Sequence, residues 1–290
     1  MTVGKDSLRR FIFEGEDILG SIVRLDDVWQ SLRSSDTYPP QIEALVGEAA
    51  AATALLGRSL KFDGRLTFQV QGAEHLRLLV MQVDNALNLR GVARYGDALP
   101  PYFTELVDGG LLCITVESDG VGGAKPERYQ SMVPLSEKSL ADCLGVYYRQ
   151  SVQLPTVIML ATNHERAAGL MLQAMPERKP GSGRWQQLLA EVGALDVMRM
   201  SGLDDNALLS VLFPEDDIRL FEAEPVAFKC DCSDERIINM LQMFSADELA
   251  NLISAKDPVE ISCQFCNHQY LVSGERILGL IDQAAGNAVH

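Results

Sequence analysis

Four cysteines near the C-terminal end of this 290-residue chain are spaced as metal ligands. Cys230 and Cys232 form a C-x-C motif, and Cys263 and Cys266 form a C-x-x-C motif after 30 intervening residues. Four thiolates that a fold brings together match the tetrahedral, soft-ligand preference of Zn²⁺. The pattern predicts one Zn²⁺ ion per chain, and two reduced thiol pairs or an iron–sulfur cluster are the alternatives.

A site with four cysteine ligands has no open position for a catalytic water, so the predicted metal would be structural. His268 lies two residues beyond Cys266 and is expected at the surface or beside the ligands rather than among them. Cys113 and Cys143 are expected to be buried small hydrophobes. The glycine-rich stretch 120–125 lacks the spacing of a phosphate-binding loop and is expected to be a hairpin loop. These residues do not predict an enzyme.

The first thirty residues contain no secretory signal, which predicts a cytoplasmic protein with reduced thiols. Oxidation would remove the zinc-binding thiolates, and the neighbours Cys230 with Cys232 and Cys263 with Cys266 have the highest effective concentration for disulfide formation. Such bridges close only short loops and cannot replace a metal that ties residue 230 to residue 266. Structural zinc contributes roughly 10–16 kcal/mol of folding free energy, so the oxidised C-terminal part should be less folded than the reduced one.

The composition is that of a globular protein, with 47% hydrophobic and 22% charged residues. No apolar stretch is long enough to span a membrane. The net charge of −15 would repel a nucleic-acid backbone, and no basic patch offsets it. We therefore expect neither a membrane nor a nucleic acid as a partner.

The residues before the cysteines predict an α+β domain over residues 1–177. Alanine-rich residues 39–60 and residues 139–150 have helical patterns. Short apolar or β-branched segments separated by Gly, Asp and Pro predict strands at 65–70, 76–83, 87–95, 111–117, 129–135, 155–161 and 169–175. A cluster of Pro, Gly and Ser at residues 176–183 predicts a domain boundary.

Residues 178–229 have helical patterns around Trp185 and Leu208, which predict an amphipathic helical linker. Its apolar and methionine side chains suit promiscuous contact when exposed, and ordinary core packing is the alternative. They include Leu188, Leu189, Met198, Met200 and Phe213, with Met171 and Met175 just upstream. Residues 230–290 are expected to form a small ββα-type zinc-binding domain with a capping box at Ser245 and Glu248.

The cysteine quartet and several upstream stretches together resemble the bacterial redox-regulated holdases of the thirty-three-kilodalton heat-shock family. The resemblance covers almost the whole chain. The upstream stretches that carry it are LKFDG at 60–64, LRGVAR at 89–94, ERYQ at 127–130, QLPT at 153–156, GLMLQAMP at 169–176 and VAFK at 226–229.

The resemblance implies an ATP-independent chaperone that is inactive when reduced and zinc-bound. Oxidative stress would form the disulfides Cys230–Cys232 and Cys263–Cys266, release zinc and unfold the C-terminal part. The activated chain would bind unfolding client proteins, often as a homodimer, and the linker would act as a second sensor. A thiol–disulfide oxidoreductase and a structural zinc-ribbon scaffold are the alternatives, although the thioredoxin-like context around Cys263 is missing.

Overall fold

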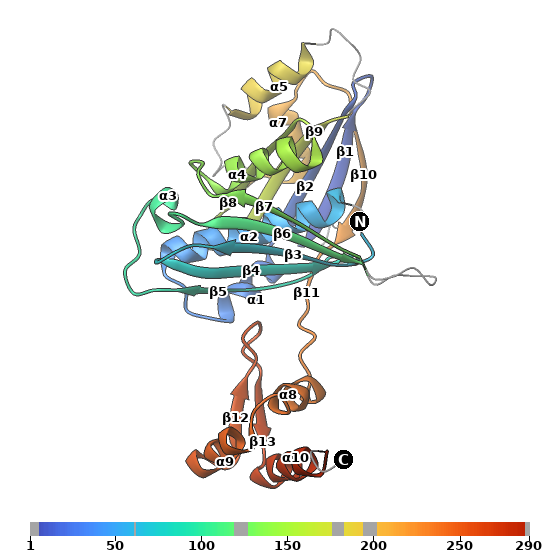
Figure 1. The fold of residues 1–290 in the computed structure, drawn as a ribbon. Coiled ribbons are helices and arrows are strands. Elements are labelled where there is room, and N and C mark those ends of the chain that lie inside the picture. Colours follow the sequence, from blue (N-terminus) through green and yellow to red (C-terminus); the bar gives the residue numbers. More distant parts are fainter. Residues whose placement is uncertain (1–5, 61, 119–126, 176–182, 194–201, 288–290) are drawn as a thin grey trace. The chain divides into compact units, whose positions relative to one another are not determined.

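The computed structural model describes residues 6–60, 62–118, 127–175, 183–193 and 202–287, with side chains as far as residue 281. The chain is α+β, as predicted, and divides into two compact units, Met1–Lys229 and Cys230–His290 (Figure 1). The predicted loop at 120–125, the predicted break at 176–183 except Gly183, and Met198 and Met200 lie outside the described residues. No helix in the described part of the chain is long and apolar enough to cross a membrane.

One sheet of the first unit, which we call sheet A, has five antiparallel strands in the order β10-β1-β2-β9-β8. Side chains alternate along each strand, and both faces of this sheet are apolar. On β2, for example, Val23 and Leu25 enter one core and Ile18 and Ile22 enter another. The strands are β1 (Ser7–Phe13), β2 (Ile18–Leu25), β8 (Thr156–Thr162), β9 (Ala167–Ala174) and β10 (Ile218–Pro225).

The other sheet of this unit, sheet B, has six strands in the order β11-β5-β4-β3-β6-β7. Five of them are antiparallel and lie at the positions predicted from the sequence, but they do not form a simple meander, because β6 pairs with β3 rather than with β5. β11 adds in parallel to β5. The strands are β3 (Gly64–Gln71), β4 (Leu76–Asp84), β5 (Asn88–Tyr95), β6 (Leu111–Ser118), β7 (Glu127–Pro134) and β11 (Ala227–Phe228).

Helix α2 (Pro40–Ser59) packs against strands of both sheets, and it matches the helix predicted over residues 39–60. Its small side chains allow this close packing: a Cβ atom at Gly47 would lie 2.5 Å from the Thr162 side chain. The other helices of the first unit are α1 (Asp27–Ser34), α3 (Phe103–Leu106), α4 (Leu140–Tyr147), the π-helical turn η2 (Tyr148–Val152), α5 (Arg184–Gly193) and α7 (Asp205–Leu212).

Glu48 on α2 is a partly buried carboxyl, and desolvation raises its pKa to about 7. Because the folded-state pKa exceeds the unfolded one, ionisation of Glu48 opposes folding above pH 7 and this cost disappears as the pH falls towards 4.5. We expect Glu48→Gln to raise the free energy of unfolding at pH 8 by about 1–2 kcal/mol, after allowance for partial solvent access. The gain should vanish at pH 4.5 in urea titrations, and an equal gain at both pH values would contradict this assignment.

The outer face of sheet A, away from α2, is covered by α5 and α7 (Figure 1). Trp185 and Leu188 of α5 and Leu208 of α7 are buried against the sheet, so these linker side chains have a core-packing role in this structure. Leu189 points the other way and is 39% exposed. The sheet residues beneath the two helices are Phe11, Phe13, Ile18, Ile22, Met159, Ala161, Ala168, Leu170, Leu172 and Ala174.

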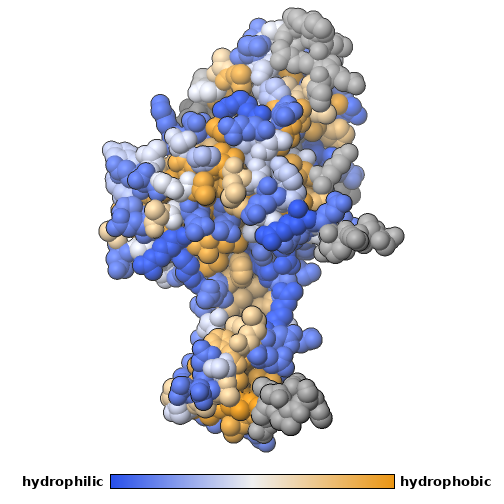
Figure 2. Space-filling view, in the orientation of Figure 1, coloured by the Kyte–Doolittle hydropathy of each residue, from blue (hydrophilic) through white to orange (hydrophobic). Residues whose placement is uncertain are grey.

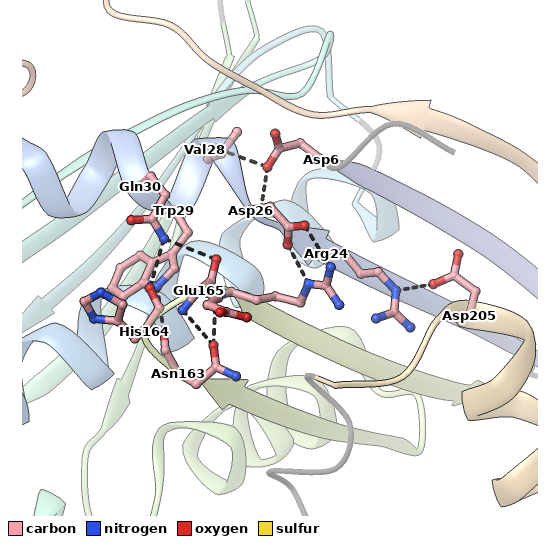
Figure 3. Close-up of polar contacts among 11 residues, drawn as sticks. Asp6, Arg24, Asp26, Val28, Trp29, Gln30, Asn163, His164, Glu165 and Asp205 are labelled. Atoms are coloured by element: carbon pink, nitrogen blue, oxygen red, sulfur yellow. Dashed lines mark hydrogen bonds and ion pairs between the residues drawn. The ribbon is translucent and has the colours of Figure 1, made fainter. Parts of the chain in front are cut away.

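A buried ion pair joins α7 to sheet A (Figure 3). Nε of Arg24 on β2 donates a hydrogen bond of 2.5 Å to Oδ1 of Asp205, the first residue of α7. Both side chains are almost fully buried, and Nε of Arg9 lies 3.8 Å from Oδ2 of the same carboxylate. Asp204 caps α7 by accepting a hydrogen bond from the Ala207 amide. These contacts attach the linker helix to the domain that precedes it.

The prediction of a helical linker is wrong for its last part, because residues 218–225 and 227–228 form strands. β10 extends sheet A beside β1, and β11 extends sheet B beside β5. Ile218 and Leu220 on β10 pack against the core beneath α5 and α7, so tertiary pairing overrides the low strand propensity of the glutamates nearby. β1 and β2 were also not predicted from the sequence.

The second unit has a small core of its own. A hairpin of β12 (Val259–Ser262) and β13 (Gln269–Val272) packs with α8 (Asp234–Leu241), α9 (Ala246–Ala255) and α10 (Gly274–Asn287). The predicted capping box is confirmed, because Ser245 and Glu248 bond reciprocally at the start of α9. The surface shown in Figure 2 is mostly hydrophilic, with orange patches on both units. On the second unit, the exposed apolar side chains include Met243 and Phe244.

Candidate metal centre

The four cysteines predicted as ligands lie at the ends of short elements in the second unit. Cys230 and Cys232 precede α8, whose N-cap Ser233 accepts a hydrogen bond from the Arg236 amide. Cys263 and Cys266 lie in the turn between β12 and β13. The Cys263 amide donates to the His268 carbonyl at 2.9 Å. A helix start and a hairpin turn thus position the two motifs.

The four sulfur atoms are brought together in one cluster. All four Sγ atoms lie within 4.8 Å of one another. The Sγ atoms of Cys230 and Cys263 are 3.6 Å apart, and those of Cys232 and Cys266 are 3.5 Å apart. Four sulfurs around one Zn²⁺ at about 2.3 Å would be separated by about 3.8 Å, whereas a disulfide bond measures about 2.05 Å. The separations therefore suit four ligands around one ion and do not correspond to disulfide bonds.

The thiols differ in their electrostatic surroundings. Burial raises the pKa of Cys230, and burial together with the neighbouring cysteines raises the pKa of Cys266. Burial also acts on Cys263, but hydrogen bonds from the Phe265 and Cys266 amides lower its pKa overall. Four thiolates so close together repel one another unless a cation offsets their charge. The donor set thus favours a soft divalent metal, and the arrangement could hold one.

Other residues considered as ligands or reactive groups lie apart from this cluster. His268 is exposed and its ring stacks edge-on against Tyr270 at 4.7 Å, so it occupies the predicted surface position beside the site. Cys143 is fully buried on α4, as predicted. The prediction for Cys113 is wrong, because this thiol on β6 is only half-buried and Nε2 of Gln130 donates a hydrogen bond to it.

One contact near the cluster could not be inferred from the spacing of the cysteines. A hydrogen bond with the Cys232 side chain raises the pKa of Tyr270, which lies on β13. The residues 269–272 read Gln-Tyr-Leu-Val, so apolar character does not alternate in the sequence; the strand itself places Tyr270 and Val272 on the buried face of the hairpin and leaves Leu271 exposed. Tyr270 therefore links the small core to the sulfur cluster.

Comparison with known proteins shows likeness over nearly the full chain. The family model described as Hsp33 protein matches residues 6–273. The 33 kDa chaperonin of Shewanella sediminis is 36% identical over 270 residues, which are 92% of this chain and 93% of that protein. The 33 kDa chaperonin of Chromobacterium violaceum is 34% identical over 279 residues, with coverages of 96% and 94%.

A solved structure has the same fold. The crystal structure of the 33 kDa chaperonin (heat shock protein 33 homolog) from Thermotoga maritima superposes with a TM-score of 0.81 at 21% identity, covering 97% of this chain and 99% of that one. The family match spans both the sheet-and-helix unit and the sulfur cluster. The chain belongs to the Hsp33 family of 33 kDa chaperonins, which are chaperones rather than enzymes, and its four-cysteine cluster is that of a redox-regulated holdase.

Proposed function

We propose that Cys230, Cys232, Cys263 and Cys266 bind one Zn²⁺ ion per chain in the reduced state. The support is the donor set: four cysteine sulfurs within 4.8 Å of one another, with separations close to those of a tetrahedral zinc site. When bound, zinc supplies a structural cross-link between the start of α8 and the β12–β13 turn. In this state the second unit is folded and the chaperone is inactive.

Oxidation removes the thiolates that hold the metal. Each disulfide forms when two thiolates lose two electrons, and one H₂O₂ molecule accepts these electrons and, with two protons, leaves as two water molecules. The family pairing is Cys230 with Cys232 and Cys263 with Cys266. The separations of 3.6 Å and 3.5 Å join sulfurs of different motifs, but the edges of a tetrahedron are nearly equal and do not select a pairing. Peptide mapping of the oxidised chain would identify the bridges.

Loss of the cross-link unfolds residues 230–290 and destabilises the linker that precedes them. The proposed division of labour is a core and dimerisation domain at 1–177, a linker at 178–229 and a redox-switch domain at 230–290. The support is the apolar face of sheet A, which would be exposed when α5 and α7 leave it. This face offers unfolding client proteins an apolar surface in the cytoplasm, and the activated chain is a homodimer.

The experiment that tests this proposal compares aggregation of a thermally unfolding client protein in the presence of the reduced and the oxidised chain. Light scattering should fall only with the oxidised chain. The number of reduced cysteine thiols should drop by four per chain as the zinc is lost. Persistent scattering after complete loss of zinc would reject the holdase proposal. Turnover in an insulin-reduction assay would favour a thiol–disulfide oxidoreductase instead.

A further inference from the structure

Within the part of the chain that the structure describes, strand β8 is an edge strand of sheet A and pairs with β9 on one side only. A groove of about 530 Å³ runs along its start, between α4 and α5. The β8 side of the groove is formed by Pro155, Thr156, Val157 and Ile158. Free strand edges bind extended polypeptide by adding it as a further strand.

The hydrogen-bond pattern of β8 shows which backbone groups are available at this edge. The Pro155 carbonyl accepts a hydrogen bond of 2.9 Å from the Ala174 amide of β9. In an antiparallel pair the bonding direction alternates, so the N–H and C=O groups of Thr156 and Ile158 point away from β9. Within the described residues, neither of these N–H groups has a backbone partner. Donors and acceptors therefore alternate along the open edge with the spacing of a β-ladder.

The walls of the groove indicate the character of the segment that would fit there. Trp185 and Leu189 of α5 and Val157 of β8 supply apolar surface. The charged lining residues are Asp142 on α4 and Arg149 on η2, and their opposite charges offset each other. The described lining therefore has no net charge with which to select an anion or a cation, and an uncharged apolar segment complements it best.

We propose that an extended apolar segment of a non-native protein pairs with the free edge of β8 and is bound there as an added strand. The inference rests on the proposed holdase function and assigns part of its client-binding surface. The departure of α5 on oxidation widens access to the edge, while Val157 of β8 and the apolar side chains of sheet A that α5 covered remain beside it. The main-chain hydrogen bonds are independent of client sequence, which suits a chaperone for many clients.

A proline at position 156 tests the inference, because it removes one outward N–H and leaves the bonds to β9 in place. Thr156→Val is the matched control: both variants lose the hydrogen bonds of the Thr156 hydroxyl with Gln173 and Leu154, but only the proline loses the backbone donor. The probe is a fluorescein-labelled octapeptide of alternating threonine and valine, titrated by anisotropy into the oxidised full-length chain. Thr156→Pro should bind it about five- to tenfold more weakly than Thr156→Val.

A second measurement distinguishes loss of peptide binding from misfolding of the proline variant. The peptide should slow amide hydrogen exchange at positions 156 and 158 of the Thr156→Val variant. Equal peptide affinity of the two variants, or unchanged exchange at both amides, would overturn the inference. The inference would also be overturned if the two variants bound the peptide equally and Thr156→Pro had a lower sedimentation coefficient than Thr156→Val. That result would show that the edge pairs with a second copy of the chain. If oxidised Thr156→Val still suppresses aggregation in these cases, the proposed function stands without this site.

Discussion

Replacing Cys232 by serine should unfold residues 230–290 and destabilise the linker at 178–229, while the core domain at 1–177 stays folded. The second unit buries only eight hydrophobic side chains in its described core, so its stability depends on the metal cross-link. Structural zinc contributes roughly 10–16 kcal/mol, which exceeds what such a small core can supply. A serine hydroxyl is a much poorer zinc ligand than a thiolate, and three cysteines cannot close the tetrahedral site.

Limited proteolysis and zinc content of the full chain would measure this effect. We expect rapid cleavage within 230–290, slower cleavage within the linker at 178–229, less than one tenth of the zinc of the unsubstituted chain, and a resistant fragment that contains the core domain at 1–177. Cys113→Ser is the matched control, since Cys113 lies on β6 of the first unit and is not one of the four clustered cysteines. It should leave both zinc content and cleavage unchanged. Full protease resistance of the second unit in the Cys232→Ser chain would contradict the structural role of the metal.

Replacing Asp205 by alanine should release α7 from sheet A even in the reduced chain. The substitution leaves the Arg24 guanidinium, only 7% exposed, without its carboxylate partner. Both Nη atoms of Arg24 already lack a hydrogen-bond partner among the described residues, so they do not compensate for the loss. Removing one member of a buried ion pair typically costs about 3–5 kcal/mol. The linker should therefore detach before the core unfolds.

Asp204→Ala provides the comparison, because it removes only the helix cap of α7 at a cost of about 1 kcal/mol. In denaturant titrations, Asp205→Ala should lose at least twice as much stability as Asp204→Ala. It should also bind an apolar fluorescent dye and slow client aggregation without oxidant, because Leu208 and its neighbours no longer cover the sheet. Equal unfolding midpoints for the two variants would show that the ion pair does not attach the linker.

The candidate site could be predicted almost completely from the sequence, because the ligand chemistry depends on residue types and short spacings. Cys230, Cys232, Cys263 and Cys266 lie in one cluster, as their two motifs indicate. The positions of the strands β3 to β7 and of α2 were also predictable, since their apolar patterns are local and bounded by Gly, Asp and Pro. Neither result required knowledge of contacts between distant segments.

The parts that were missed depend on pairing between distant segments. Arg24 and Asp205 are 181 residues apart, and nothing in either local sequence indicates that they meet. β10 contains glutamates and follows an acidic turn, so its strand conformation comes from pairing with β1 rather than from propensity. The exposure of Cys113 depends on its position on the outward face of β6 beside Gln130, which the apolar pattern of residues 111–117 does not reveal.

The most direct test of the account follows zinc release and chaperone activity in one sample during oxidation. Zinc is measured with a colorimetric chelator while light scattering records client aggregation, over a time course with H₂O₂ at mildly elevated temperature. The account predicts that one zinc per chain is released and that suppression of aggregation rises as the zinc is lost. Release of all the zinc with no change in client aggregation, or a reduced protein that contains none, would contradict it.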